Sequence, residues 1–162
     1  MTMETDVKNS RYYLNRELSW LQFNKRVLQE AVDTSNPLLE KLKFLAITSS
    51  NLDEFFMIRV AGLKHQKENG VKRRDIANMT PTEQLENISD ACQKLVAQQY
   101  MHLKGILKEL ETEGLVFIKP TDADERQKQW MGNYFEREIF PVVTPMAVDS
   151  SHPFPFLASK RL

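Results

Sequence analysis

An apolar stripe at helical spacing runs from Leu85 to Leu110, and it limits the folds open to this chain more than any other feature. Its members are Leu85, Ile88, Cys92, Leu95, Val96, Leu103, Ile106, Leu107 and Leu110. Thr80, Pro81 and Glu83 precede the stripe as a cap residue, a proline suited to the first helical position and a capping-box glutamate. Gly114 can end the helix. A helix of about 33 residues is about 50 Å long and needs other helices to cover its stripe.

Shorter helical patterns precede the long one. Ser19 and Gln22 form a capping-box pair at the start of the first, which should stop near Asp33. Asn36 followed by Pro37 restarts a helix that runs to about residue 47, and a third helix should run from residue 52 to residues 69–70. The sequence therefore predicts a mainly α fold, an N-terminal helical bundle of three shorter helices and one long helix. A coiled-coil partner is the alternative use of the long stripe.

The polar stretch at residues 48–54 lies where the second predicted helix ends and the third begins. A helix N-terminus carries partial positive charge and unpaired N–H groups, so this junction could receive an anion or the polar edge of a nucleotide. The simpler interpretation is that Ser50 or Asn51 caps the helix, with Glu54 completing a capping box around Asn51. Asp53 and Glu54 point about 100° apart on a helix, which disfavours a shared metal ion.

The pattern changes after Gly114. Residues 115–118 are a candidate buried strand, and a further helix should begin between Asp122 and Glu125, with Trp130, Met131, Tyr134, Phe135 and Ile139 facing inward. Residues 140–157 are rich in proline and apolar residues, which favours extended chain. Because such segments form no stable sheet alone, we expect residues 113–162 to be the incomplete start of an α/β head domain, after a helical domain at residues 1–112.

Composition excludes several classes of protein. The formal net charge of the 162 residues is zero, so nothing favours nucleic acid as a partner. Cys92 is the single cysteine, which excludes an intrachain disulfide and a cysteine-built metal site and makes it a candidate small core residue. We find no transmembrane segment and no signal peptide at the N-terminus, so the cytoplasm is the expected location.

No familiar catalytic motif is present. The five glycines do not cluster into a phosphate loop, and His65, His102 and His152 are scattered without paired ligands. Lys72, Arg73 and Arg74 form a basic run that is typical of a solvated loop, and we assign it no role. The residues alone therefore predict no catalytic residue and no metal ligand.

Several blocks, in order, resemble the long, histidine-phosphorylating class of polyphosphate kinases. They are Tyr13–Ala31, which contains Asn15-Arg16-Glu17-Leu18-Ser19-Trp20, then Ser35–Leu45, Ser50–Phe55, and Tyr134–Asp149 with the His152-Pro153-Phe154-Pro155-Phe156 run. The resemblance covers nearly the whole chain. It implies the N-terminal portion of an enzyme that transfers the terminal phosphoryl group of ATP reversibly to polyphosphate, with Mg²⁺ and through a phosphohistidine.

The resemblance also implies roles for parts of this chain. It implies homodimers that are cytoplasmic or peripherally associated with membranes, and an N-terminal domain that covers the base of ATP, with Asn51 as a nucleotide-binding residue. The phosphorylated histidine of the family matches no residue here, so we expect this chain alone to bind ATP weakly, to hold no cofactor tightly and to be inactive. The alternative is a non-catalytic helical module that associates with a full-length kinase subunit or another helix.

Overall fold

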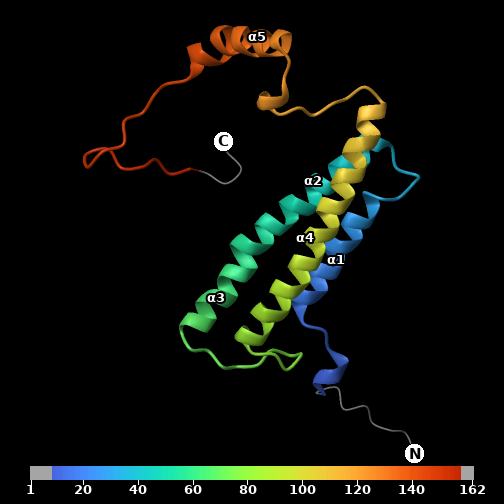
Figure 1. The fold of residues 1–162 in the computed structure, drawn as a ribbon. Coiled ribbons are helices and arrows are strands. Elements are labelled where there is room, and N and C mark those ends of the chain that lie inside the picture. Colours follow the sequence, from blue (N-terminus) through green and yellow to red (C-terminus); the bar gives the residue numbers. More distant parts are fainter. Residues whose placement is uncertain (1–8, 158–162) are drawn as a thin grey trace, which may run out of the picture. The chain divides into compact units, whose positions relative to one another are not determined.

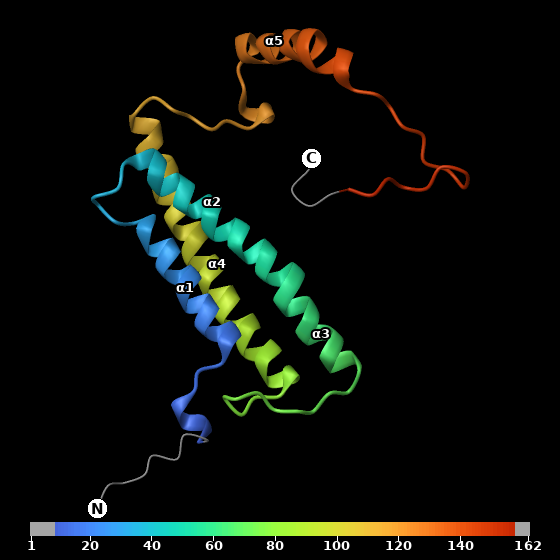
Figure 2. The same ribbon diagram turned by 180° about the vertical axis from the view of Figure 1, so that it is seen from behind.

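The computed structural model describes residues 9–157, and the chain divides into two units, Met1–Phe117 and Ile118–Leu162. The first unit contains α1 (Arg16–Glu30), α2 (Leu38–Phe55), α3 (Ala61–Glu68) and the long α4 (Pro81–Thr112). Both α1 and α2 contact α4, and α3 contacts the N-terminal half of the same helix (Figures 1 and 2). The predicted bundle of shorter helices beside one long helix is confirmed.

The second and third predicted helices form one continuous rod. The helix α2 passes through residues 48–51 without a break and continues through a π-helical turn, Phe56–Val60, into α3. The predicted junction is therefore wrong, and neither Ser50 nor Asn51 caps a helix. The polar side chains have other partners: the Thr48 hydroxyl donates to the Phe44 carbonyl at 2.8 Å, and the Asn51 amide donates across the bundle to Asn24 at 2.9 Å. No helix N-terminus exists there to receive an anion.

The helix ends follow local rules with two differences from prediction. The α1 helix is capped by Asn15, whose side-chain oxygen accepts from the N–H groups of Glu17 and Leu18, so the predicted box at Ser19 is wrong. The predicted cap at Asn36 is also wrong: Pro37 is the N-cap residue of α2, and the Asn36 side chain donates to the Glu30 carbonyl instead. The Thr80–Glu83 capping box of α4 is confirmed.

Both predicted glycine stops are also confirmed. Gly70 and Gly114 follow α3 and α4 with φ values of +69° and +86°. This left-handed conformation is the one that glycine adopts without steric cost at the end of a helix.

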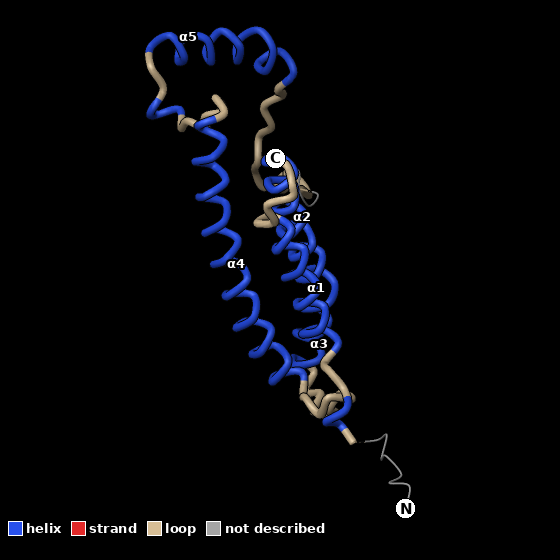
Figure 3. Tube along the Cα trace, turned by 90° about the vertical axis from the view of Figure 1, so that its right-hand side faces the viewer, coloured by secondary structure: helices blue, strands red, loops and turns tan. Residues whose placement is uncertain are grey.

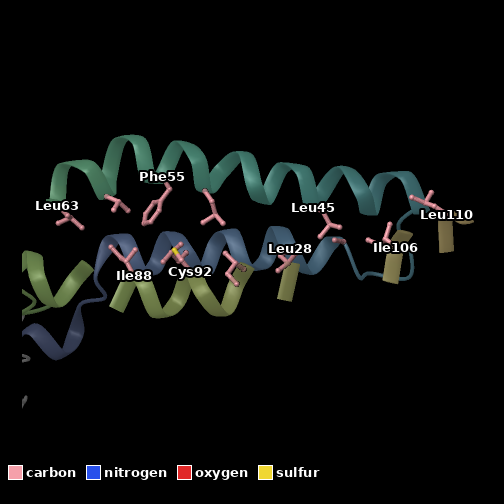
Figure 4. Packing of buried hydrophobic residues seen from close by; sticks show 13 residues of the cluster. Leu28, Leu45, Phe55, Leu63, Ile88, Cys92, Ile106 and Leu110 are labelled. Carbon is pink, nitrogen blue, oxygen red and sulfur yellow. The ribbon is translucent and has the colours of Figure 1, made fainter. Parts of the chain in front are cut away.

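The core of the first unit lies between α4 and the other helices. Ile88, Cys92, Leu95, Ile106 and Leu110 of the predicted stripe are buried, and the rest of the stripe is half-buried at its margin. Figure 4 shows side chains of this core, with Leu28, Leu45, Phe55, Leu63, Ile88, Cys92, Ile106 and Leu110 labelled. The helices of the same bundle cover the stripe, which disfavours the coiled-coil alternative.

The second unit contains α5 (Glu125–Tyr134), which Asp124 caps with Gln127 in a reciprocal box. A π-helical turn, Phe135–Ile139, and a short 3₁₀ turn, Phe140–Val142, follow it. The predicted inward residues Trp130, Tyr134, Phe135 and Ile139 are exposed and Met131 is half-buried, so an inward face is wrong for this unit taken by itself. The cause is the absence of a covering layer among the described residues of this unit.

The described residues, 9–157, contain helices and loops but no strand (Figure 3). The segment 115–118, predicted as a buried strand, is exposed and forms no strand, and the Leu115 N–H donates to the Leu110 carbonyl at the end of α4. A strand needs a neighbour to accept and donate its ladder hydrogen bonds, and no described segment supplies one. The α/β character of a head domain therefore stays a prediction.

Candidate functional site

A cleft of about 520 Å³ opens between α1 and the α2–α3 rod. Its walls combine charged, amide and aromatic side chains: Arg16, Glu17, Trp20, Phe23, Asn51, Glu54, Phe55, Ile58, Arg59, Gly62, Leu63 and Gln66. The volume falls within the range of about 300–1,000 Å³ that is usual for small-molecule sites. This cleft brings Asn51, the one residue that the family resemblance singled out, next to groups that the sequence analysis did not select.

Asn51 is half-buried on the α2 wall of the cleft. Its side-chain nitrogen donates to Oδ1 of Asn24, and its carboxamide oxygen has no hydrogen bond to a described residue. No buried side-chain polar atom of the described residues lacks a partner, so this oxygen is accessible to solvent. An accessible acceptor on a fixed amide can receive a hydrogen bond from a ligand.

Glu17 sits at the base of the cleft between two arginines. Its side chain is only 5% exposed, and its carboxylate oxygens lie 2.6 Å from Arg16 Nη2 and 3.2 Å from Arg59 Nη1. The Arg16 side chain is 81% exposed and that of Arg59 is 36% exposed. The buried carboxylate therefore holds both guanidinium groups: Arg16 donates to it from Nε at 2.9 Å and from Nη2, and Arg59 donates to its other oxygen from the opposite helix.

Aromatic rings also line the cleft. The Trp20 ring stacks on Phe55 with 4.5 Å between centroids, and Phe23 lies 6.5 Å from Trp20 at a tilt. The Arg26 guanidinium lies over the Phe23 ring at 5.9 Å. A planar apolar wall beside an amide is suited to an aromatic ligand, because rings stack favourably on other rings.

Sequence reasoning missed Glu17, Asn24 and Arg59. A signal for two of them was present: Glu17, Leu21, Asn24 and Leu28 recur at steps of four, three and four residues, and all four are buried on α1. A carboxylate and an amide at positions of an apolar stripe indicate paired polar groups in the interior. Arg59 carried no such signal, because its partner Glu17 lies on another helix.

The other candidate residues do not gather into a site. His65 contacts Asn69, and His152 lies 3.0 Å from Asp149, each within its own turn. Arg74 pairs with Glu83, and the basic run 72–74 does not line the cleft. Among residues 9–157, no group of three or more His, Cys, Asp or Glu side chains could hold a metal ion.

The side chains of Asp53 and Glu54 face different spaces. Glu54 lines the cleft beside α1, whereas Asp53 lines a groove of about 530 Å³ between α2 and α4. A second groove, of about 1,050 Å³, lies between α3 and α4 and shares Phe56 and Val96 with the first. Both grooves are mainly apolar, although Lys64, Lys67, Glu68, Ser89 and Gln93 line part of the second one. The α1 cleft differs from them in holding the buried Glu17 carboxylate with its arginine partners and the Asn51 amide.

Two family comparisons cover most of the chain. The family described as polyphosphate kinase N-terminal domain matches residues 13–118, and that described as polyphosphate kinase middle domain matches residues 126–162. A protein named polyphosphate kinase from Synechocystis sp. is 49% identical to this chain over 158 residues, and one of the same name from Bacillus cereus is 48% identical over 159 residues. The chain therefore belongs to the polyphosphate kinase family.

The match is uneven in length. It covers 97% of this chain but only 22% of the Synechocystis relative and 23% of the Bacillus cereus relative, and it corresponds to their N-terminal part. The predicted family is confirmed, and the comparisons do not favour the alternative of a non-catalytic module. A domain boundary between residues 112 and 113 stays a prediction. No helix within residues 9–157 is long and apolar enough to cross a membrane.

Proposed function

We propose that this chain supplies the base-binding side of the ATP site in a polyphosphate kinase. The complete enzyme would transfer the terminal phosphoryl group of ATP to polyphosphate, as the name of its relatives suggests. The observation that carries the proposal is the half-buried Asn51 amide, which presents an accessible oxygen to a cleft of ligand size.

Adenine suits the chemistry of this cleft. Its amine and neighbouring ring nitrogen form a donor and acceptor pair that an asparagine amide can match with two hydrogen bonds. The Trp20–Phe55 stack adds a flat aromatic wall against which a base can lie. Asn51 would thus fix the edge of the base, and Trp20 would contact its face.

The phosphate side of the reaction would need more positive charge than the described residues of the cleft provide. Phosphoryl transfer depends on positioning and on concentrated positive charge around the phosphates. In the cleft, Glu17 is paired with both Arg16 and Arg59 and so offsets part of their charge. We therefore propose that the chain alone binds ATP without transferring its phosphate. Mg²⁺ would arrive with the nucleotide, because this ion is usually bound through substrate phosphates together with only one or two carboxylates.

Family membership supports three broader proposals. The complete enzyme would act as a homodimer, use ATP with Mg²⁺, and work in the cytoplasm, including in peripheral association with membranes. None of these depends on the geometry of the cleft, and each would be tested on the longer protein.

The direct test is ATP binding by the purified chain, followed by NMR or calorimetry. We expect weak binding of ATP, with a dissociation constant that rises at least about fivefold in Asn51→Ala. This rise corresponds to the loss of about one net hydrogen bond. Gln99→Ala is the matched control, because Gln99 also donates from a half-buried amide across the bundle, at 2.9 Å to the Leu45 carbonyl, but lies outside the cleft. Equal affinities of the two variants would refute the role of Asn51.

A second assay tests the absence of turnover. The chain is incubated with ATP, Mg²⁺ and polyphosphate, and the polyphosphate length is measured over time. We expect no elongation above a protein-free control. Robust elongation would contradict the proposal, because it would require residues of this chain that carry out phosphoryl transfer.

A further inference from the structure

We propose that Asn24 fixes the orientation of the Asn51 amide and thereby makes the cleft prefer adenine to guanine nucleotides. This inference rests on the proposed function, since it concerns the ligand of the same cleft. It assigns Asn24 as a positioning residue that acts through Asn51 and does not itself line the cleft.

The orientation follows from a backbone carbonyl that can only accept. Asn24 Nδ2 donates to the carbonyl oxygen of Thr48 at 3.1 Å. That contact requires the NH₂ end of the Asn24 amide, which leaves its oxygen directed at Asn51. Asn51 Nδ2 then donates to this oxygen at 2.9 Å. The Thr48 carbonyl thus fixes which way the Asn24 amide faces, and Asn24 in turn fixes which way the Asn51 amide faces.

Burial prevents the reverse arrangement. Asn24 and Thr48 are both 0% exposed, so water cannot satisfy an amide turned the wrong way. A reversed Asn24 would place its oxygen against the Thr48 carbonyl, and its NH₂ group against the NH₂ group of Asn51. Two acceptors in contact and an unsatisfied donor in the interior are strongly disfavoured. Asn51 therefore presents its oxygen and one remaining N–H to the ligand.

That polarity discriminates between purines. Adenine carries an amine donor at the position where guanine carries a carbonyl acceptor. For a base held in the same pose, the Asn51 oxygen accepts a hydrogen bond from adenine but meets the guanine oxygen as a second acceptor. A bidentate amide contact of this kind commonly changes affinity by about tenfold or more between bases.

The test measures dissociation constants of the purified chain for ATP, GTP and purine riboside triphosphate, which lacks the exocyclic amine. NMR shifts of the Asn51 side chain report whether each nucleotide enters the cleft. We expect wild type to prefer ATP to GTP by at least about tenfold, with purine riboside triphosphate in between. In Asn24→Leu, which is nearly isosteric, we expect the preference to fall to about twofold or less, because Asn51 can then turn either way.

Leu28→Ala is the control for general loosening of α1. Leu28 is 2% exposed and lies on the same buried stripe of α1, one turn after Asn24. Its apolar side chain takes no part in the hydrogen bonds that join Thr48, Asn24 and Asn51. We expect it to lower stability and to keep the nucleotide preference. A merely structural role for Asn24 predicts instead that both variants change affinity for ATP and GTP alike, which would overturn the inference.

The outcomes separate the two proposals. ATP binding in the cleft without preference over GTP overturns the adenine inference and leaves the proposed function standing. Absence of any Asn51 shift with ATP overturns the proposed function, and the inference with it. If Asn24→Leu does not fold, the wild-type nucleotide series still decides, together with a scalar coupling across the hydrogen bond from Asn24 Nδ2 to the Thr48 carbonyl. A missing coupling there would also overturn the inference.

Discussion

The Trp20 and Phe55 rings lie parallel, with 4.5 Å between their centroids and 5° between their planes. Phe55 is 1% exposed and is among the largest fully buried side chains of the described residues, whereas Trp20 is half-buried and lines the cleft. The pair therefore joins the core of the bundle to the wall of the candidate site. A substitution that removes the Phe55 ring should therefore also disturb Trp20 and weaken ligand binding in the cleft.

Phe55→Ala should lower the free energy of unfolding by about 3–5 kcal/mol, because it removes a buried ring and leaves a cavity. Urea unfolding followed by circular dichroism measures this change. Phe56→Ala is the matched control: Phe56 is the next residue but is 43% exposed, and its loss should cost about 1 kcal/mol. Equal costs for the two substitutions would contradict the placement of Phe55 in the core.

Glu17→Ala should lower stability by about 2 kcal/mol, since it strands Arg59 and removes charge-assisted hydrogen bonds. Arg59→Ala should cost about 1 kcal/mol and Arg16→Ala about 0.5 kcal/mol or less, because the Arg16 side chain is 81% exposed. A double-mutant cycle between Glu17 and Arg59 isolates their coupling. A coupling near zero would mean that Glu17 does not hold Arg59 on the cleft wall.

The cap of α4 should respond to acid. The backbone N–H of Thr80, and then its hydroxyl, donate to the Glu83 carboxylate and hold the Glu83 pKa below its ordinary value of 4.5. A carboxylate whose pKa is lowered by folding stabilises the fold above its unfolded pKa, and this contribution is lost as pH falls through the lower folded value. The stability advantage of wild type over Glu83→Gln should therefore be constant above about pH 4.5 and shrink below it.

Thermal unfolding across pH 2–7 measures the effect for both proteins, with Glu86→Gln as the control for losing one exposed carboxylate from the same helix. An advantage of wild type over Glu83→Gln that persists unchanged at the acid end would contradict the capping box.

Cys92 should react slowly in the folded chain. It is 6% exposed, and burial raises the pKa of its thiol to about 11, so almost no thiolate is present at neutral pH. Alkylation by iodoacetamide at pH 7.5 should therefore be at least about tenfold slower than in the unfolded chain in urea. Comparable rates in the two states would show that the α3–α4 interface opens readily around this residue.

The sequence predicts the bundle well where the signals are local. The stripe from Leu85 to Leu110, the Thr80 cap and the stops at Gly70 and Gly114 each depend on neighbours within a few residues. The helix break predicted at residues 48–51 is wrong because the deciding contact is distant in the sequence. Polar residues there resemble a cap, but the partner of Asn51 is Asn24, 27 positions earlier in the chain. Tertiary hydrogen bonds decide whether such residues end a helix or join two.

The candidate site shows the same division. The family resemblance selects Asn51, and the stripe spacing could have revealed Glu17 and Asn24 as polar residues at buried positions. Arg59 and the Trp20–Phe55 stack are properties of two helices together, which no local pattern contains. The strand expected at residues 115–118 fails similarly, because strand formation depends on a neighbour and none is found among residues 9–157.

Intermolecular NOEs between ATP and the cleft test the central claim most directly. With the isotope-labelled chain and saturating ATP, we expect NOEs from the adenine H2 or H8 protons to the Trp20 ring and to the Asn51 side-chain amide. Trp130 belongs to the second unit and does not line the cleft, so its indole signals serve as an internal control. NOEs confined to the apolar grooves beside α4, or ATP binding with no contact to Trp20 and Asn51, would contradict the account.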